Sequence, residues 1–206
     1  MAPDDGACMK LHSRLQKFQS KTRLPKRIEG KLAAWIFHNV DPFPSDPGAS
    51  NKPMSRYDPD THADAVIREI ESRCETMDAD ASLFPAVAFV FAVEAGRRGK
   101  EQREAGRMTD ARRTTACLSA FAKKLARRDR DEPEFHIVMS LAFAQEAKDG
   151  WHVNDYVVIE AAWRRALGEA GIALLLDPRN VDARVRLANL QEKLINLASR
   201  QSVNGR

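Results

Sequence analysis

Residues 161–190, AAWRRALGEAGIALLLDPRNVDARVRLANL, are the stretch that decides the fold of this chain. Ala166, Ala170 and Ala173 recur at helical spacing, so one face of the segment carries only small side chains. Pro178 ends this pattern, and a new apolar pattern that includes Leu187-Ala188 follows it. Small residues let paired helices approach closely, and the proline separates one helix from the next. The stretch therefore predicts stacked helical hairpins, an architecture that commonly provides a binding surface.

Helical periodicity extends through most of the remaining chain. Apolar residues recur at three- and four-residue steps between Ile28 and Val40 and between Ala63 and Ile70. No segment alternates convincingly like a strand, so the predicted class is all-α, either a helical-hairpin array or an irregular helical bundle. Further helices are expected at about 83–98, 109–128, 134–148, 155–176 and 180–198. The predicted N-caps are Asp60 or Thr61 and Thr109 or Asp110; the prolines expected at helix starts are Pro25, Pro85, Pro133 and Pro178.

Proline content divides the chain into three parts. Five of its ten prolines lie between residues 42 and 59, which indicates an extended linker over 41–60. This linker separates a basic helical N-terminal segment, residues 1–40, from a helical-repeat-like domain, residues 61–206. No apolar run approaches the roughly 20 residues of a membrane span, and a signal peptide is not evident. The three cysteines lie far apart, as is typical of free thiols in a reducing cytosol, so a cytoplasmic protein is expected.

Charge is strongly segregated along the sequence. Residues 1–40 carry a net charge of +5 and residues 96–130 carry +8, whereas residues 41–95 carry −7 and residues 131–206 carry −2. One interpretation is that the acidic and basic segments neutralise one another within the fold or across a dimer. The other is that the basic segments bind an anion such as nucleic acid. The oligomeric state and the identity of any partner stay open.

Residues 166–191 resemble the tetratricopeptide repeat. Ala166, Ala173 and Pro178 stand where that repeat has two small residues and its terminal proline, and Leu187-Ala188 matches its Leu-Gly pair. The chain departs from the pattern at Ala170, Arg184 and Gln191, where aromatic residues are usual. A faint internal repeat matches residues 91–95 with residues 143–147 at an offset of 52, and Ser140-Leu141-Ala142 with Arg186-Leu187-Ala188 at an offset of 46. Both offsets are longer than the 34-residue period of the family.

The resemblance implies a non-catalytic protein-interaction or adaptor module that holds a peptide or a partner helix in a concave groove. The groove would be lined by the first helix of each pair, here 83–98, 134–148 and 180–198. The polar residues predicted to contact the partner are Gln145, Asn189 and Lys193. No cofactor is implied.

An alternative function is a nucleic-acid-associated regulatory protein that uses residues 10–31 and 97–113. Basic residues line one ridge of the helix predicted for the first segment, and the second segment is expected to be a glycine-containing loop. Phosphates would suit both segments; the competing interpretation is that the same side chains are solvated and bind no anion. The residues concerned are Lys10, Arg14, Lys17, Lys21, Arg97, Arg98, Arg112 and Arg113.

Residues 58–69 imitate a calcium loop, with acidic residues or His62 at five of its ligand positions. Ala63 replaces the glycine that such a loop needs, so helix capping is the preferred explanation and no metal is predicted. The phosphate-loop, dinucleotide, nucleophile-elbow and HExxH motifs are missing, which favours a binding protein and leaves an enzyme as the third alternative.

Overall fold

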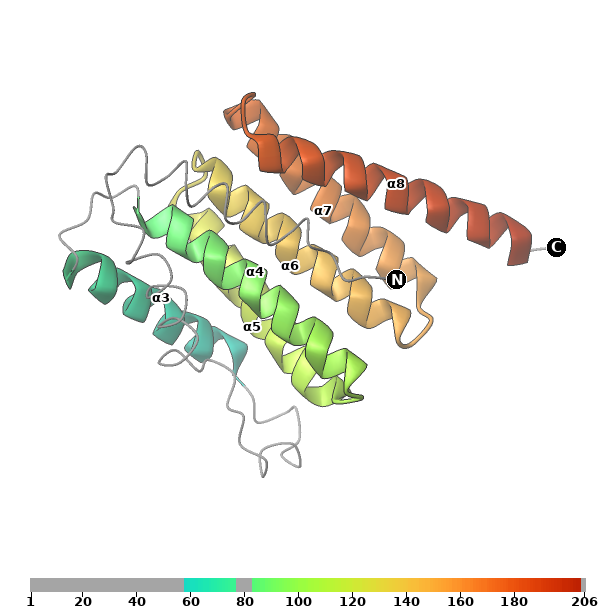
Figure 1. Ribbon diagram of the computed structural model, residues 1–206, viewed down its shortest axis with the longest axis horizontal. Helices are drawn as coiled ribbons and strands as arrows, with labels where there is room; N and C mark the ends of the chain where they lie inside the picture. The colour runs from blue at the N-terminus through green and yellow to red at the C-terminus, as the bar shows by residue number, and fades with distance from the viewer. Residues whose placement is uncertain (1–57, 77–82, 205–206) are drawn as a thin grey trace.

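The computed structural model describes residues 58–76 and 83–204, and every regular element within these ranges is an α-helix (Figure 1). The all-α prediction is therefore confirmed for this part of the chain. The N-terminal segment 1–40 and nearly all of the predicted linker lie outside the described residues. The helices are α3 (Pro59–Thr76), α4 (Leu83–Glu104), α5 (Met108–Arg128), α6 (Pro133–Trp151), α7 (Tyr156–Leu176) and α8 (Val181–Asn204).

The helices pack largely in the order in which they follow one another. Helix α4 pairs with α5, α6 pairs with α7, and α8 packs against α7, while α3 lies against α5. Helix α4 also contacts α6, and Arg186 joins α8 to Ser140 of α6. Figure 1 shows α4, α6 and α8 running in the same direction along one side of the array. We call this side the α4–α6–α8 face.

The alanine stripe of α7 explains how closely α6 and α7 pack. Ala166, Ala170 and Ala173 are completely buried, as the sequence predicts, and α6 and α7 make the most extensive helix contact in the described part of the chain. The hydroxyl of Ser140 on α6 donates a hydrogen bond to the backbone carbonyl oxygen of Ala166 at 2.7 Å. A side chain on one helix reaches the backbone of its neighbour only where no bulky residue holds the two apart.

Aromatic side chains fill the wider spaces between the helices. Phe91 of α4 packs against Phe121 of α5 with ring centroids 4.8 Å apart, and Trp151 of α6 packs against Trp163 of α7 at 5.9 Å. Both phenylalanines are buried, so they contribute hydrophobic area as well as ring contacts. Rings therefore pack within both hairpins, and the α6–α7 hairpin also contains the alanine stripe of α7.

Some of the prolines and polar residues between the helices lie at helix starts, as the sequence predicts. Pro133 is the first residue of α6, and Pro178 lies in the turn before α8, where Asn180 Oδ1 accepts a hydrogen bond from the Ala183 N–H at 3.0 Å. Gly106 ends the α4 region with a φ of 72°, a backbone conformation that glycine adopts at little cost. These residues fix the short turns that make consecutive helices antiparallel.

Two predicted caps were wrong. Helix α3 starts at Pro59, and the Asp58 carboxylate accepts hydrogen bonds from the Asp60 N–H and the Thr61 hydroxyl. Helix α5 starts at Met108, after a residue whose side chain makes no capping hydrogen bond. Both helices begin slightly earlier than expected; at α3, proline fits the first helical turn and the preceding aspartate can cap it.

The expectation that residues 97–113 form a glycine-containing loop was also wrong. Helix α4 continues through Gly96 and Gly99 to Glu104, and only residues 105–107 separate it from α5. The reason at Gly96 is packing, because a Cβ atom there would lie 2.8 Å from Nε2 of Gln145. Gly96 thus makes room for a side chain of α6, and the helix passes through it uninterrupted.

Charge segregation is explained in part by the packing of α3 against α5. Lys124 of α5 lies 2.9 Å from the carboxylate of Asp64 and 3.7 Å from that of Asp60, and Arg128 forms an ion pair with Glu71. Acidic α3 belongs to the segment of net charge −7, and α5 to the segment of +8. Neutralisation within the fold, the first interpretation of the charge pattern, is therefore observed at this contact.

Candidate functional site

A buried polar network ties the last turns of α4 to α6. The side chain of Arg103 is 4% exposed; its Nη1 lies 2.7 Å from Oδ1 of Asp149, and its Nη2 donates to Oε1 of Gln145 at 2.5 Å. Gln102, also buried, accepts a hydrogen bond from the Thr114 hydroxyl of α5 at 2.8 Å. The network satisfies the Arg103 guanidinium with one carboxylate and one amide, as a buried charge requires.

Lys148 lies beside this network and lacks a comparable partner. Burial lowers the pKa of its ammonium group to about 8, and the positive charges nearby lower it in the same direction. Within residues 58–76 and 83–204, no hydrogen bond or ion pair neutralises Lys148. The neighbouring charges come from three helices of the α4–α6–α8 face, and together with Lys148 we call them the Lys148 cluster: Lys100, Arg103, Lys148, Arg186 and Lys193.

Arg186 brings α8 to this cluster. Its Nε donates to the Ser140 hydroxyl oxygen at 2.6 Å, and its Nη2 donates to the Ser140 carbonyl oxygen at 2.9 Å. Burial lowers the pKa of Arg186 to about 10, partly opposed by Asp182, so the guanidinium stays charged at neutral pH. The acceptors of these two hydrogen bonds are neutral oxygen atoms of Ser140, which leave the positive charge of Arg186 in place.

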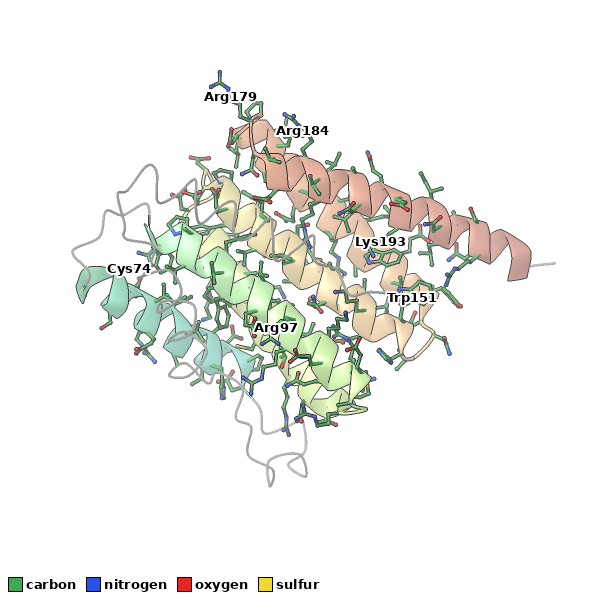
Figure 2. The ribbon with its side chains drawn as sticks, viewed as in Figure 1. Cys74, Arg97, Trp151, Arg179, Arg184 and Lys193 are labelled. Carbon is green, nitrogen blue, oxygen red and sulfur yellow. The ribbon has the colours of Figure 1, made fainter. Side chains whose placement is uncertain are left out.

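The three residues predicted to contact a partner occupy different environments. Gln145 is buried and engaged with Arg103, whereas Asn189 and Lys193 are exposed on α8. The Lys193 ammonium lies over the Trp163 ring, 5.6 Å from its centroid, and Figure 2 shows it on the side of α8 that is turned toward the α6–α7 hairpin. Asn189 and Lys193 are therefore accessible, and Gln145 instead positions Arg103.

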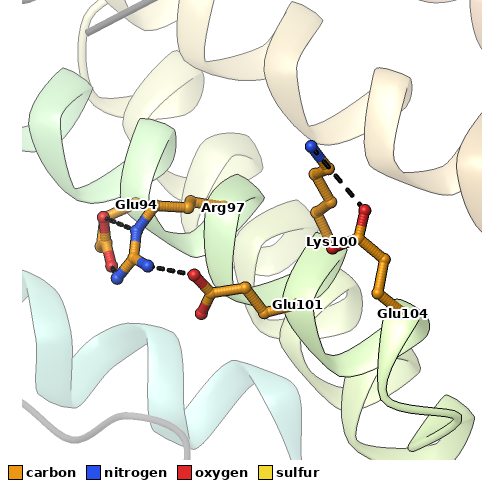
Figure 3. Close-up of polar contacts among 5 residues, drawn as sticks. All are labelled: Glu94, Arg97, Lys100, Glu101 and Glu104. Atoms are coloured by element: carbon orange, nitrogen blue, oxygen red, sulfur yellow. Dashed lines mark hydrogen bonds and ion pairs between the residues drawn. The ribbon is translucent and has the colours of Figure 1, made fainter. Parts of the chain in front are cut away.

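The basic residues of 97–113 do not gather on one exposed surface. Arg97 is exposed but forms ion pairs with Glu94 and Glu101 on its own helix, as Figure 3 shows. Arg113 is buried, with Nη1 3.7 Å from Asp110, and Arg98 is half-buried, whereas Arg112 is exposed. The other four residues proposed for anion binding lie outside the described part of the chain: Lys10, Arg14, Lys17 and Lys21.

Lys100 differs from Arg97 although the two share α4. Figure 3 shows Arg97 directed to Glu94 and Glu101, whereas Lys100 extends away from them toward Glu104. The Lys100 ammonium is 3.7 Å from that carboxylate, and both side chains are more than half exposed, so the ion pair is weak. Lys100 can therefore add its charge to the Lys148 cluster at the solvent side.

Lys100 and Arg103 lie in the basic segment 97–113, but no linear motif connects them with Lys148 and Arg186, which sequence reasoning did not single out. The four residues come from three helices, and only the packing of α4, α6 and α8 brings them together. One signal was present in the internal repeat, where Ser140 and Arg186 are matched at an offset of 46. These two residues contact each other in the structure. Equivalent positions of successive repeats are neighbours when the repeats stack, so the offset identified a contact.

The described residues contain neither a candidate metal site nor a candidate membrane-spanning helix. No group of three or more histidine, cysteine, aspartate or glutamate side chains in residues 58–76 and 83–204 is arranged to hold a metal ion. Within the same ranges, none of the helices combines the length and the apolarity that crossing a bilayer requires. No family model, curated protein or solved structure matches this chain. Any functional conclusion therefore depends on the geometry of the chain itself.

Proposed function

We propose that this chain is a non-catalytic protein-interaction module that binds a segment of another protein along the α4–α6–α8 face. The resemblance of residues 166–191 to the tetratricopeptide repeat supports this proposal, because that family binds peptides or helices on the first helices of its pairs. Here those helices are α4, α6 and α8. Asn189 and Lys193 on α8 are the exposed predicted contacts.

The single observation that carries the proposal is the concentration of positive charge around Lys148. Burial and the positive charges of Arg103, Lys193, Arg186 and Lys100 lower the pKa of Lys148. Lys148 gains no hydrogen bond or ion pair in the described residues. Burying a charge among like charges costs free energy that folding alone does not require. A binding partner that brings opposite charge to this face would remove that cost.

The nucleic-acid alternative gains no support from residues 97–113. Arg97 and Arg103 are already paired with carboxylates, and Arg113 is buried. A phosphate backbone is bound by a row of accessible basic side chains, which these residues do not form. The protein-interaction proposal therefore remains the better supported of the two.

Selection of peptides against the full chain tests the proposed function. A library of random peptides displayed on phage should yield sequences that bind the wild-type protein, and Lys193→Glu should weaken their binding at least tenfold. The matched control is Arg164→Glu, which changes an exposed basic residue of α7 that pairs with Glu160 of its own helix. Equal effects of the two substitutions, or no enriched peptide at all, would refute the proposal.

A nucleic-acid measurement completes the test. Binding of a DNA duplex and of a single-stranded RNA is measured by fluorescence anisotropy between 50 and 300 mM salt, on the order of the range over which phosphate contacts weaken markedly. We expect no binding that depends steeply on salt. Tight, salt-dependent binding to either nucleic acid, lost in Arg112→Gln, would favour the alternative function.

A further inference from the structure

Helix α8 carries apolar residues on two opposite sides. Three residues at seven-residue spacing are buried and belong to the side that packs against α7: Ala183, Leu190 and Leu197. Three more have the same spacing, each two residues earlier, and are exposed: Val181, Ala188 and Ile195. Two residues correspond to about 200° around an α-helix, so the exposed row lies on the side of α8 away from α7. We call this row the α8 outer stripe.

The α8 outer stripe has no cover within the described part of the chain. Val181 is 54% exposed and Ile195 is 65% exposed. Figure 1 shows α8 as the outermost helix of the array, with α7 and α6 on one side of it. A helix packed on one side normally has polar residues on the other, whereas α8 presents apolar residues over about 21 Å. Seven-residue spacing of apolar residues is typical of a helix that pairs with another helix.

Two residues of opposite charge flank the centre of the stripe. Arg184 and Glu192 are exposed and lie four residues before and after Ala188, so they share its side of the helix. The Arg184 guanidinium donates to the carbonyl oxygen of Pro178, a neutral acceptor, at 2.8 Å. Neither Arg184 nor Glu192 forms an ion pair with another described residue. The stripe is therefore positive toward the start of α8 and negative toward its end.

We infer that the α8 outer stripe binds the same stripe of a second copy of this chain, with the two helices antiparallel about Ala188. Val181 then meets Ile195 of the second copy, and Arg184 lies level with Glu192 of the second copy. A two-fold axis relates the copies, so each contact occurs twice. A parallel pair would bring like charges together. The small side chain of Ala188 lets the helices approach closely at the centre.

This pairing goes beyond the proposed function, because it uses another side of α8. Lys193 is turned toward the α6–α7 hairpin, over the Trp163 ring (Figure 2), and does not belong to the stripe. The dimer would therefore carry two α4–α6–α8 faces, one from each copy. A single pair of helices buries less area than a standard protein interface, so the dimer is weak and the chain is monomeric in dilute solution.

Sedimentation velocity of the full chain tests the pairing at concentrations from about 1 μM to about 1 mM, the range in which small interfaces dissociate. We expect the average mass to rise with concentration from that of one chain toward that of two. Val181→Asp should raise the dissociation constant of the dimer roughly tenfold or more, because it places a carboxylate against Ile195. The matched control is Val157→Asp, which changes an exposed valine in the first turn of α7 and should leave the dissociation constant unchanged.

Charge reversal tests the antiparallel arrangement. Arg184→Glu and Glu192→Arg each bring like charges together at both symmetry-related contacts, so each should weaken the dimer about threefold or more. The double variant has opposite charges in exchanged positions and should recover the affinity of the wild type. A chain that stays monomeric at the highest concentration, equal dissociation constants in the two valine variants, or a double variant no tighter than the single ones would overturn the inference.

Discussion

Arg186 of α8 donates two hydrogen bonds to Ser140 of α6, one to the hydroxyl oxygen at 2.6 Å and one to the carbonyl oxygen at 2.9 Å. The same hydroxyl donates to the Ala166 carbonyl oxygen of α7 at 2.7 Å. One serine therefore joins three helices. This contact connects the alanine stripe, which lets α6 and α7 approach, to the Lys148 cluster, to which Arg186 belongs.

Ser140→Ala should lower stability by about 1–3 kcal/mol, the usual cost of leaving buried hydrogen-bonding groups without a partner. The substitution removes the acceptor of Arg186 Nε and the donor to Ala166 together. Urea unfolding followed by circular dichroism measures the change. Ser199→Ala, at an exposed position of α8, serves as the control and should change stability by less than about 0.5 kcal/mol. Equal losses in the two variants would contradict the role given to Ser140.

Gly96→Ala and Gly168→Ala should change stability in opposite directions. A Cβ atom at Gly96 would lie 2.8 Å from Nε2 of Gln145, so alanine displaces Gln145 from Arg103, with an expected loss of about 1–3 kcal/mol. A Cβ atom at Gly168 meets nothing within 4 Å, so alanine should stabilise α7 by about 0.5–1 kcal/mol. Thermal unfolding of both variants measures the two effects. Stabilisation by Gly96→Ala would show that Gln145 is not confined as described.

Lys148→Met should stabilise the free protein at neutral pH, on the order of 3 kcal/mol given the size of the pKa shift. Because burial lowers the Lys148 pKa from 10.5 to about 8, the unfolded chain binds more protons between these values. Wild-type stability should therefore rise with pH across this window, and Lys148→Met should reduce the rise. Urea midpoints at pH 7, 9 and 10.5 measure it. The pH dependence of stability could instead be the same in wild type, Lys148→Met and Lys123→Met. That result would exclude Lys148 as its cause.

Glu132→Gln should stabilise the protein at pH 8 and have little effect at pH 4. Burial raises the pKa of Glu132 from 4.5 to about 8, and the hydrogen bond and charge of Glu134 raise it further in the same direction. The folded protein therefore binds more protons between pH 4.5 and 8, and its stability falls as the pH rises. Glutamine keeps an oxygen that accepts from the Glu134 N–H but carries no charge. Melting temperatures across this range should show the difference, with exposed Glu192→Gln as the unaffected control.

The sequence predicted those parts of the fold that depend on local pattern. The alanine spacing located the close α6–α7 contact, and the apolar period located the helices within a few residues. Local pattern was misleading at Gly96 and Gly99, where the glycines were interpreted as part of a flexible loop. The residue that requires a glycine at position 96 is Gln145, which is about 50 residues away in sequence. The Lys148 cluster could not be predicted for the same reason. Its members meet only after α4, α6 and α8 have packed, so no short window of sequence contains it.

The lengths of the helices also limit the size of anything that lies along the α4–α6–α8 face. These helices contain 22, 19 and 24 residues, which at about 1.5 Å per residue gives a span of roughly 28–36 Å. A partner helix lying parallel to them would match this span with about 20 residues, and an extended strand would match it with about ten. Lys148 lies close to the C-terminal end of α6, so a partner group that contacts it would lie at one end of such a segment. A peptide that contacts Lys148 would then extend along the face in one direction from that end.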